Sequence, residues 1–331
     1  MMGLFSKRRS QRNGTRTKPL SILFTTDLHG SEAAFRKYVN AAVKFNADAC
    51  VLGGDLTGKA LVPLVEDGGE YSAEFMGRRL SASTDQELAD IERTIRLAGQ
   101  YPFRTTAAGV AHMRDHPEAV DEVFLAAMRE SLHGWFDLAA ERLGDRGVKL
   151  FAICGNDDPL ELDEVLASHA FVEHVDGRVA ELAPGIAVLG FSGANRTPWN
   201  SPREFDEDDI RARLEHSIGM LEATETSIWN IHVPPRNSGL DTCAEVRADL
   251  TVVSDGGEPR LHGAGSTAVR ELIEAYQPQL TVHGHIHESR GISKLGTTVS
   301  VNPGSEYTEG ILRAAFIRIG TAGVKTQLLS T

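Results

Sequence analysis

The chain has 331 residues, of which 41% are hydrophobic and 24% are charged, a composition typical of a globular protein with a sizeable core. This composition excludes a low-complexity or fibrous chain. The 34 Lys and Arg residues against 46 Asp and Glu residues give a net charge of −12, which argues against a broad surface for nucleic acid or anionic membrane. An anionic ligand would therefore have to be attracted by a local positive site.

Cysteine usage and the N-terminal segment bear on location. The three cysteines, Cys50, Cys154 and Cys243, are widely spaced without a CxxC motif, so we expect packing positions in a reducing compartment. Residues 1–17 are rich in Lys and Arg and predict a flexible basic tail, and the apolar run after them is too short for a secretory leader. No stretch is apolar for long enough to predict a transmembrane helix. We therefore expect a cytoplasmic protein whose folded domain spans residues 18–331.

The predicted elements begin with a strand, a helix and a second strand. Residues 21–25 are a short apolar and β-branched run, typical of a buried parallel strand. Ser31 can cap the next helix, in which Phe35 and Val39 begin an apolar face. Residues 49–52 form the second predicted strand. Both strands end in sharp turns at the carboxyl edge of the sheet, where open α/β folds bind their ligands.

Residues 58–147 interrupt this alternation with a mainly helical pattern. Thr84 and Glu87 form a capping box before one amphipathic segment, and a longer segment runs from Pro117 to Leu143. We interpret the whole stretch as an insertion packed against the core. A helical hairpin without chemistry is the preferred interpretation, and a cap or a surface for homo-oligomerisation is the alternative.

Strands resume after the insertion. The predicted strands are residues 150–154, 186–191, 227–232, 280–283, 298–301, 314–319 and 324–329. A helix is expected over residues 266–276, with Pro278 marking its end. Because the last strands follow one another without helices between them, two mixed sheets packed together fit better than one parallel sheet.

Oxygen and imidazole donors follow several of these strands. They are Asp27 and His29, Asp55, Asn156, His232, and the pair His285 and His287. Alternate residues of an extended segment point the same way, so each pair separated by one residue can direct two donors at one point. Singly, each donor has an ordinary interpretation as a turn residue, a cap or a satisfied polar group. Together, the seven predict one metal-binding cluster.

Five separated motifs carry a resemblance to a known family. The motifs are Asp27-x-His29, Gly53-Gly54-Asp55, Gly155-Asn156, His232 and Gly284-His285-x-His287. In this order they resemble the calcineurin-like metallophosphoesterase superfamily, over about residues 20–305. Within it, the chain is similar to bacterial and archaeal predicted phosphoesterases related to cyclic-nucleotide phosphodiesterases. The resemblance implies an α/β fold, a four-layer α-β-β-α sandwich of two mixed sheets, with a dinuclear metal centre at its edge.

The resemblance also implies a role for each donor. The implied ligands are Asp27, His29 and His287 for one ion, Asn156, His232 and His285 for the second, and Asp55 as the bridge. A hydroxide between two divalent ions would attack the phosphate ester. Two such ions outweigh the charge of two carboxylates, so an acidic protein could bind phosphate here. Mixed nitrogen and oxygen ligands suit Mn, Fe, Zn or Ni, and Mn is the choice for an assay.

One position departs from the superfamily's pattern. Its usual Gly-Asn-His is here Gly155-Asn156-Asp157, followed by Asp158. The resemblance implies that the histidine contacts phosphate and assists the leaving group, which makes Asp157 and Asp158 the predicted catalytic residues. An ionised Asp157 would repel phosphate unless the pair of aspartates kept one proton. Because a monoester dianion suffers this repulsion more than a diester monoanion, we expect phosphodiesters such as cyclic or small nucleotides as substrates.

Other functions stay open at this stage. A phosphomonoesterase is one alternative, and a metal-binding scaffold for protein interactions without turnover is another. A nuclease is disfavoured by the acidic balance. Residues 53–60 nearly match a P-loop, but Ala60 lacks the hydroxyl that binds Mg²⁺, so a nucleoside triphosphatase is a minor alternative. Asn195, Arg196 and Trp199 could touch the substrate, although an ordinary surface loop is the preferred interpretation.

Overall fold

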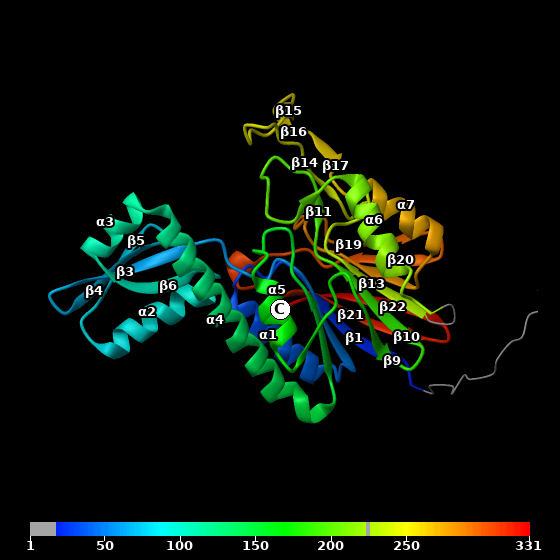
Figure 1. Cartoon of the computed structure of the whole chain (residues 1–331), viewed down its shortest axis with the longest axis horizontal. Coiled ribbons are helices and arrows are strands. Elements are labelled where there is room, and N and C mark those ends of the chain that lie inside the picture. The colour runs from blue at the N-terminus through cyan, green and yellow to red at the C-terminus, as the bar shows by residue number, and fades with distance from the viewer. Residues whose placement is uncertain (1–17, 223–225) are drawn as a thin grey trace, which may run out of the picture.

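The computed structural model describes residues 18–222 and 226–331, so the basic tail predicted for residues 1–17 lies outside the described residues. At its centre, two six-stranded sheets pack against each other, and helices cover the outer face of each sheet (Figure 1). This is the four-layer α-β-β-α sandwich of two mixed sheets that the sequence predicts.

The first sheet has the strand order β22-β21-β1-β2-β7-β8. Its strands are β1 (Leu20–Thr25), β2 (Ala49–Gly53), β7 (Lys149–Ile153), β8 (Val172–His174), β21 (Arg313–Gly320) and β22 (Gly323–Ser330). β1, β2, β7 and β8 run parallel, whereas β21 and β22 are antiparallel to their neighbours. Every residue of β1 and β2 is buried, as expected for parallel strands that are covered on both faces.

The second sheet has the strand order β19-β20-β18-β13-β10-β9. Its strands are β9 (Val179–Ala183), β10 (Ile186–Phe191), β13 (Thr226–Ile231), β18 (Leu280–Val282), β19 (Gly291–Leu295) and β20 (Thr298–Asn302). The four strands β10, β13, β18 and β20 are parallel. The side chain of Asn230 donates a hydrogen bond of 2.9 Å to the Leu52 carbonyl and so joins β13 to β2. The carboxyl ends of these two strands therefore meet.

Apolar packing holds the four layers together. Between the sheets, Phe24, Val51 and Val282 belong to one buried core. The helices on the first sheet are α1 (Glu32–Lys44), α4 (Pro117–Leu143) and α5 (Leu162–Ser168), and those on the second are α6 (Glu207–Ile218) and α7 (Thr267–Tyr276). The Ser31 side chain accepts a hydrogen bond from the Ala34 amide at the start of α1, which confirms its predicted capping role.

Residues 58–147 contain more than the predicted helices. Their elements are β3 (Leu61–Asp67), β4 (Glu70–Phe75), β5 (Arg78–Ala82), α2 (Asp85–Leu97), β6 (Tyr101–Thr106), α3 (Ala107–Asp115) and α4. The capping box of Thr84 and Glu87 starts α2, as predicted. However, the four-stranded sheet β5-β4-β3-β6 is absent from the elements predicted for this mainly helical stretch. The four-stranded sheet forms a lobe beside the sandwich together with α2 and α3. The long helix α4 runs from this lobe to the sandwich, where it packs against α1 (Figure 1).

The inserted sheet escaped prediction because β4 and β5 bury few of their residues and Pro63 interrupts the apolar run of β3. In β4 and β5, only Ala73, Phe75 and Ala82 are buried, so the apolar alternation that marks a strand is weak. These residues pack with Leu88 and Ile95 of α2 in a small core that is separate from the cores of the sandwich. The strands are therefore stabilised by tertiary packing on α2 rather than by a strong local pattern.

Three two-stranded ribbons lie on the connections that follow β10 and β13. They are β11 (Ala194–Asn195) with β12 (Glu204–Phe205), β14 (Thr242–Ala244) with β17 (Leu261–Gly263), and β15 (Ser254–Asp255) with β16 (Glu258–Pro259). Two 3₁₀ turns, η1 (Gly144–Arg146) and η2 (Tyr307–Glu309), complete the elements. Cys50 and Cys154 are buried, Cys243 is half-buried, and all three are free. Within the two described ranges, no helix is long and apolar enough to cross a membrane.

Candidate metal centre

The structure brings all seven predicted ligands together at one edge of the sandwich. Asp27 and His29 follow β1, Asp55 follows β2, Asn156 follows β7, His232 follows β13, and His285 and His287 follow β18. The first five are buried, whereas His285 and His287 are partly exposed. The cluster therefore has a closed side within the sandwich and an open side that a ligand could approach.

Short contacts connect the seven side chains in series. The distances are 3.3 Å from Asp27 Oδ1 to His287 Nε2, 3.1 Å from His287 Nε2 to His29 Nε2, 3.6 Å from His29 Nε2 to Asp55 Oδ2, 3.5 Å from Asp55 Oδ1 to His232 Nε2, 2.9 Å from His232 Nε2 to Asn156 Oδ1, and 2.7 Å from Asn156 Oδ1 to His285 Nδ1. Asp55 stands in the middle, because its two oxygens face different histidines. The donors thus form two groups that share one carboxylate.

The chemistry of the donors fits metal ions. In the first group, one ligand atom each from Asp27, His29, Asp55 and His287 lies within 4.8 Å of the others. So many electron-pair donors at one point are favourable when a cation lies among them. A mixed set of carboxylate, amide and imidazole ligands suits Mn, Fe, Zn or Ni.

The backbone at these strand ends is strained, and hydrogen bonds hold it. Asp27, His29, Asp55 and His285 have φ values of 52°, 41°, 49° and 67°, in the left-handed region that costs a non-glycine residue roughly 1–2 kcal/mol. The Asp27 amide donates to the Gly54 carbonyl and the His29 amide donates to the Asp55 carbonyl, both at 2.9 Å. The two loops therefore lock each other in the conformations that direct the donors inward.

Burial and neighbouring charges set the protonation of the cluster. Burial raises the pKa of Asp27, but the hydrogen bond and charge of His287 outweigh it and hold that pKa well below its ordinary value. Burial lowers the pKa of His29 and of His285 to about 4, so both imidazoles are neutral at pH 7. Burial also acts against the charged form of His232, but the Asp55 carboxylate raises its pKa to about 10. Carboxylates and neutral imidazoles are the forms that bind metals, so Asp27, His29 and His285 are already in that form, whereas His232 would lose its proton when an ion bound.

Two further residues hold the loop that carries the histidine pair. The Asn302 side chain donates to the carbonyls of Gly284 at 3.3 Å and Ile286 at 3.0 Å. The Ser305 hydroxyl donates a hydrogen bond of 2.6 Å to the Asp27 carbonyl. This part of the chain therefore ties the loop after β18 to the loop after β1 and fixes the separation of their donors.

Comparisons with known proteins agree with this architecture. No protein-family model matches the chain. An uncharacterized protein of Methanocaldococcus jannaschii, MJ1162, is 30% identical over 167 residues, which are 49% of this chain and 68% of that protein, so the two belong to one family. One solved structure has a TM-score of 0.56 at 19% identity, over 94% of this chain and 98% of the other. TT1561 of Thermus thermophilus has a TM-score of 0.53 at 15% identity, over 93% and 98%.

The similarity to these solved structures shows the fold alone, and the motifs at the strand ends carry the resemblance to the calcineurin-like metallophosphoesterase superfamily. The chemistry of the site depends on this chain's own side chains. Asp157 stands where the superfamily's usual motif has a histidine and Asp158 follows it, and the structure separates the roles of these two side chains.

Asp158 does not face the cluster, which corrects its prediction as a catalytic residue. It is fully buried. Its carboxylate accepts hydrogen bonds from the amides of Leu56 at 3.0 Å, Thr57 at 2.9 Å and Gly155 at 2.8 Å, and from the Thr57 hydroxyl at 2.6 Å. Asp158 thus holds the loop after Asp55 against the loop after β7. Both carboxylate oxygens of Asp158 are occupied by these donors, so Asp158 does not share a proton with Asp157.

Asp157 is ionised and paired with Lys59, a cation that is not among the predicted site residues. It forms an ion pair with Lys59 and accepts hydrogen bonds from Asn156 Nδ2 at 2.9 Å and Ser201 Oγ at 2.7 Å. Burial raises the pKa of Asp157, but Lys59 outweighs burial and keeps that pKa below its ordinary value. Its main-chain amide also donates to Asp55 Oδ1 at 3.0 Å. Asp157 therefore carries a negative charge that Lys59 compensates.

A cleft of about 580 Å³ opens on the partly exposed side of the cluster. The inner end of the cleft is lined by four of the predicted ligands and by the pair of Lys59 and Asp157. The four ligands are Asp55, Asn156, His285 and His287. The outer wall consists of the 195–201 loop, Arg236, and residues of β14 and β17. Asn195, Arg196 and Trp199 thus lie on the wall of the cleft, and the side chain of Trp199 is 60% exposed. The loop therefore borders the cleft, and contact of these three residues with a substrate stays a prediction.

The sequence does mark Lys59, but as part of a near match to a P-loop. Lys59 occupies the lysine position of the near match to a P-loop in residues 53–60. In the structure these residues are the end of β2 and a turn that leads into β3, whereas a P-loop leads into a helix. The nucleoside triphosphatase alternative is therefore not supported.

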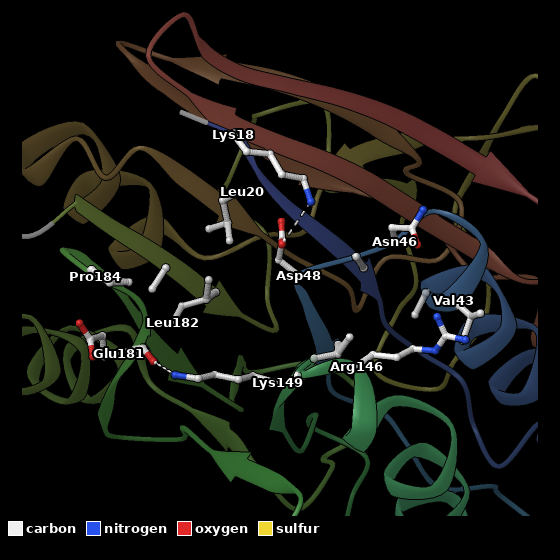
Figure 2. Close-up of a pocket in the computed structure, with 15 residues that line it drawn as sticks. Lys18, Leu20, Val43, Asn46, Asp48, Arg146, Lys149, Glu181, Leu182 and Pro184 are labelled. Atoms are coloured by element: carbon white, nitrogen blue, oxygen red, sulfur yellow. Dashed lines mark hydrogen bonds and ion pairs between the residues drawn. The ribbon is translucent and has the colours of Figure 1, made fainter. Parts of the chain in front are cut away.

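Two other sites are separate from this cleft. Asp163, His174 and Asp176 form a second group with metal-ligand spacing, but Arg203 donates to Asp163 at 3.0 Å and Ser192 donates to both oxygens of Asp176 at 2.8 Å. These contacts occupy three of the four carboxylate oxygens of the group, and His174 Nε2 lies 3.5 Å from the fourth, Asp163 Oδ1. A cavity of about 630 Å³ lies at the amino ends of β1 and β7, lined by residues that include Lys18, Asp48, Arg146 and Lys149, and none of the predicted ligands lines it (Figure 2).

Proposed function

We propose that the protein is a dinuclear metal-dependent phosphoesterase that hydrolyses phosphodiesters. The position of Asp55 carries the proposal, because its Oδ2 lies 3.6 Å from His29 Nε2 and its Oδ1 lies 3.5 Å from His232 Nε2. A carboxylate that faces two groups of donors is suited to bridge two cations. The resemblance of the five motifs to those of the calcineurin-like metallophosphoesterase superfamily supports the same reaction class.

Each group of donors would hold one divalent ion. The proposed ligands are Asp27, His29 and His287 for the first ion, Asn156, His232 and His285 for the second, and Asp55 for both. When bound, two divalent ions supply the positive charge that binds a phosphoryl group and that makes water acidic enough to attack it. Mn, Fe, Zn and Ni are compatible with these ligands.

The protein's own groups orient the site for this reaction. The amide of Asp157 donates to Asp55 Oδ1, which fixes the orientation of the shared carboxylate. The Gly53 carbonyl lies 2.8 Å from His232 Nδ1, so that ring directs its Nε2 toward Asp55 and Asn156. The cleft then presents the phosphate to the cluster from its open side.

The charge beside the cluster favours diesters over monoesters. The ion pair of Lys59 and Asp157 has no net charge, so it compensates the second negative charge of a monoester dianion less than a cation alone would. The cleft also has room for organic groups beyond the phosphate, and Trp199 exposes a ring on which a nucleobase could stack. Cyclic or small nucleotides are therefore the proposed substrate class.

The test compares a diester with a monoester. After reconstitution with Mn²⁺, we expect hydrolysis of bis-p-nitrophenyl phosphate to exceed that of p-nitrophenyl phosphate and to be lost in Asp55→Ala. Asp208→Ala, on the exposed surface of α6, is the matched control that should retain activity.

Each other result would change the proposal in a defined way. Faster turnover of the monoester would overturn the diester preference and support the phosphomonoesterase alternative. If neither substrate showed metal-dependent turnover, the phosphoesterase proposal would fail, and a metal-binding scaffold without turnover would become the better explanation. Metal content measured on the same samples would show that the ions had been loaded.

A further inference from the structure

We propose that Lys59 binds the substrate's phosphate directly, with its ammonium group presented to the cluster by the ion pair with Asp157. The inference rests on the proposed function of the metal centre. It concerns a residue that lies outside the set of metal ligands. Its alternative is that Lys59 only neutralises Asp157.

The place of Lys59 in the cleft supports this role. Lys59 and Asp157 line the cleft together with Asp55, His285 and His287. The side chain of Lys59 is 51% exposed, whereas that of Asp157 is 27% exposed, so the ammonium group is the more accessible member of the pair. An ammonium group has three N–H donors, and the bond to Asp157 leaves donors for a phosphate oxygen. A phosphate held by the cluster would therefore meet a cation at the inner end of the cleft.

The backbone that carries Lys59 is held from two sides. Asp158 accepts hydrogen bonds from the amides of Leu56 and Thr57. On the other side, the amide of Gly58 donates to the Tyr101 hydroxyl at 2.9 Å, and a Cβ added at Gly58 would lie 2.1 Å from the Gly99 carbonyl oxygen. This contact leaves no room for a side chain at position 58. The loop therefore delivers Lys59 to a defined place.

The balance of charge gives the pair a function that neither member has alone. Asp157 would add a third carboxylate beside Asp27 and Asp55, which would weaken the binding of any phosphate. Lys59 cancels that charge, and Asp157 in turn restrains a side chain that is otherwise flexible. Restraint lowers the entropy cost of the contact between the lysine and the phosphate. Ser201 donates to Asp157 at 2.7 Å and so keeps the carboxylate in position for this task.

The experiment measures the binding of inorganic phosphate to the Mn²⁺-loaded protein by calorimetry, after free metal has been removed. We expect Lys59→Ala to weaken phosphate binding about 10- to 100-fold, the effect of losing one hydrogen bond between charged groups. Lys59→Arg should retain most of the affinity, because it keeps the positive charge. Lys294→Ala, on exposed β19, is the matched control and should bind as the unchanged protein does.

A double variant separates direct binding from neutralisation. If Lys59 binds phosphate, Lys59→Ala combined with Asp157→Asn should remain as weak as Lys59→Ala. If Lys59 only neutralises Asp157, the double variant should recover the affinity of the unchanged protein, and this recovery would overturn the inference. An affinity for Lys59→Ala within twofold of the unchanged protein, at equal metal content, would also overturn it.

Failure of the inference about Lys59 can be distinguished from failure of the phosphoesterase proposal. Phosphate binding is measured without turnover, so it tests Lys59 even if no ester is hydrolysed. If the protein hydrolyses the diester, the inference also predicts that Lys59→Ala raises KM more than it lowers kcat. Hydrolysis with an unchanged KM in Lys59→Ala would leave the phosphoesterase proposal intact and refute the role of Lys59.

Discussion

The inner and outer ends of the cleft are built in different ways. At the inner end, seven side chains are linked by contacts of 2.7–3.6 Å, and four of them stand on residues with positive φ. At the outer end, Trp199 and Arg236 are exposed side chains on loops. The inner end is therefore rigid enough to hold ions at fixed places, whereas the outer end presents side chains that could adjust to a ligand.

The outer wall nevertheless has an ordered backbone. Glu204 is buried and accepts hydrogen bonds from the amides of Thr197 at 2.8 Å and Ser201 at 3.1 Å, and from the Thr197 hydroxyl. The side chain of Asn195 donates to the Ala264 carbonyl at 3.2 Å, which connects this loop to the segment after β17. The contrast between the two ends thus concerns side chains more than backbone. Substitutions at the inner end should affect the fold and the reaction, and those at the outer end should affect binding.

The largest effect is expected for Asp158→Ala. The substitution leaves three buried amides without an acceptor, those of Leu56, Thr57 and Gly155, and each lost hydrogen bond costs about 1–3 kcal/mol. We expect the free energy of unfolding, measured by chemical denaturation, to fall by about 3 kcal/mol or more. Metal content should fall as well, because the loop that carries Asp55 loses its support.

The control for this variant is Asp176→Ala. Asp176 also accepts two hydrogen bonds from one neighbour, Ser192, but lies away from the cleft. Its substitution should lower stability and leave the metal content unchanged. If Asp158→Ala retained both stability and metal, the rigidity of the inner end would have to come from other contacts, and the comparison between the two ends would fail.

The two ends of the cleft also differ in how well the sequence predicts them. The clustering of the seven proposed ligands was predictable because each belongs to a short motif at the end of a predicted strand, and parallel strands bring their ends together. The ion pair of Lys59 and Asp157 was not predictable, because the two residues lie far apart along the chain and no local pattern marks their contact. The structural role of Asp158 was not predictable either, because its carboxylate accepts hydrogen bonds from Leu56 and Thr57, which are distant in the sequence. The inserted sheet was missed because its few buried side chains form a small core with α2, and no strong apolar alternation marks β4 and β5.

An intermediate effect is expected for Asp157→His, at the boundary between the two ends. The substitution removes a negative charge that lies beside the proposed phosphate position. The ratio of kcat/KM for p-nitrophenyl phosphate to that for bis-p-nitrophenyl phosphate should rise about tenfold, which corresponds to about 1.4 kcal/mol. Asp157→Asn separates the loss of charge from the gain of an imidazole. An unchanged ratio in Asp157→His would show that charge at this position does not select between monoesters and diesters.

The smallest effect is expected for Trp199→Ala, at the outer end. Because the ring is 60% exposed, its loss should change the free energy of unfolding by no more than about 0.5 kcal/mol. If an aromatic part of the substrate stacks on this ring, KM for bis-p-nitrophenyl phosphate should rise about fivefold with little change in kcat. Trp199→Phe should retain most of the affinity, and Leu250→Ala, which removes an exposed apolar side chain outside the cleft lining, should have no effect. A fall in kcat with an unchanged KM would instead place Trp199 among the groups that support the reaction, and the outer end would no longer be a binding surface alone.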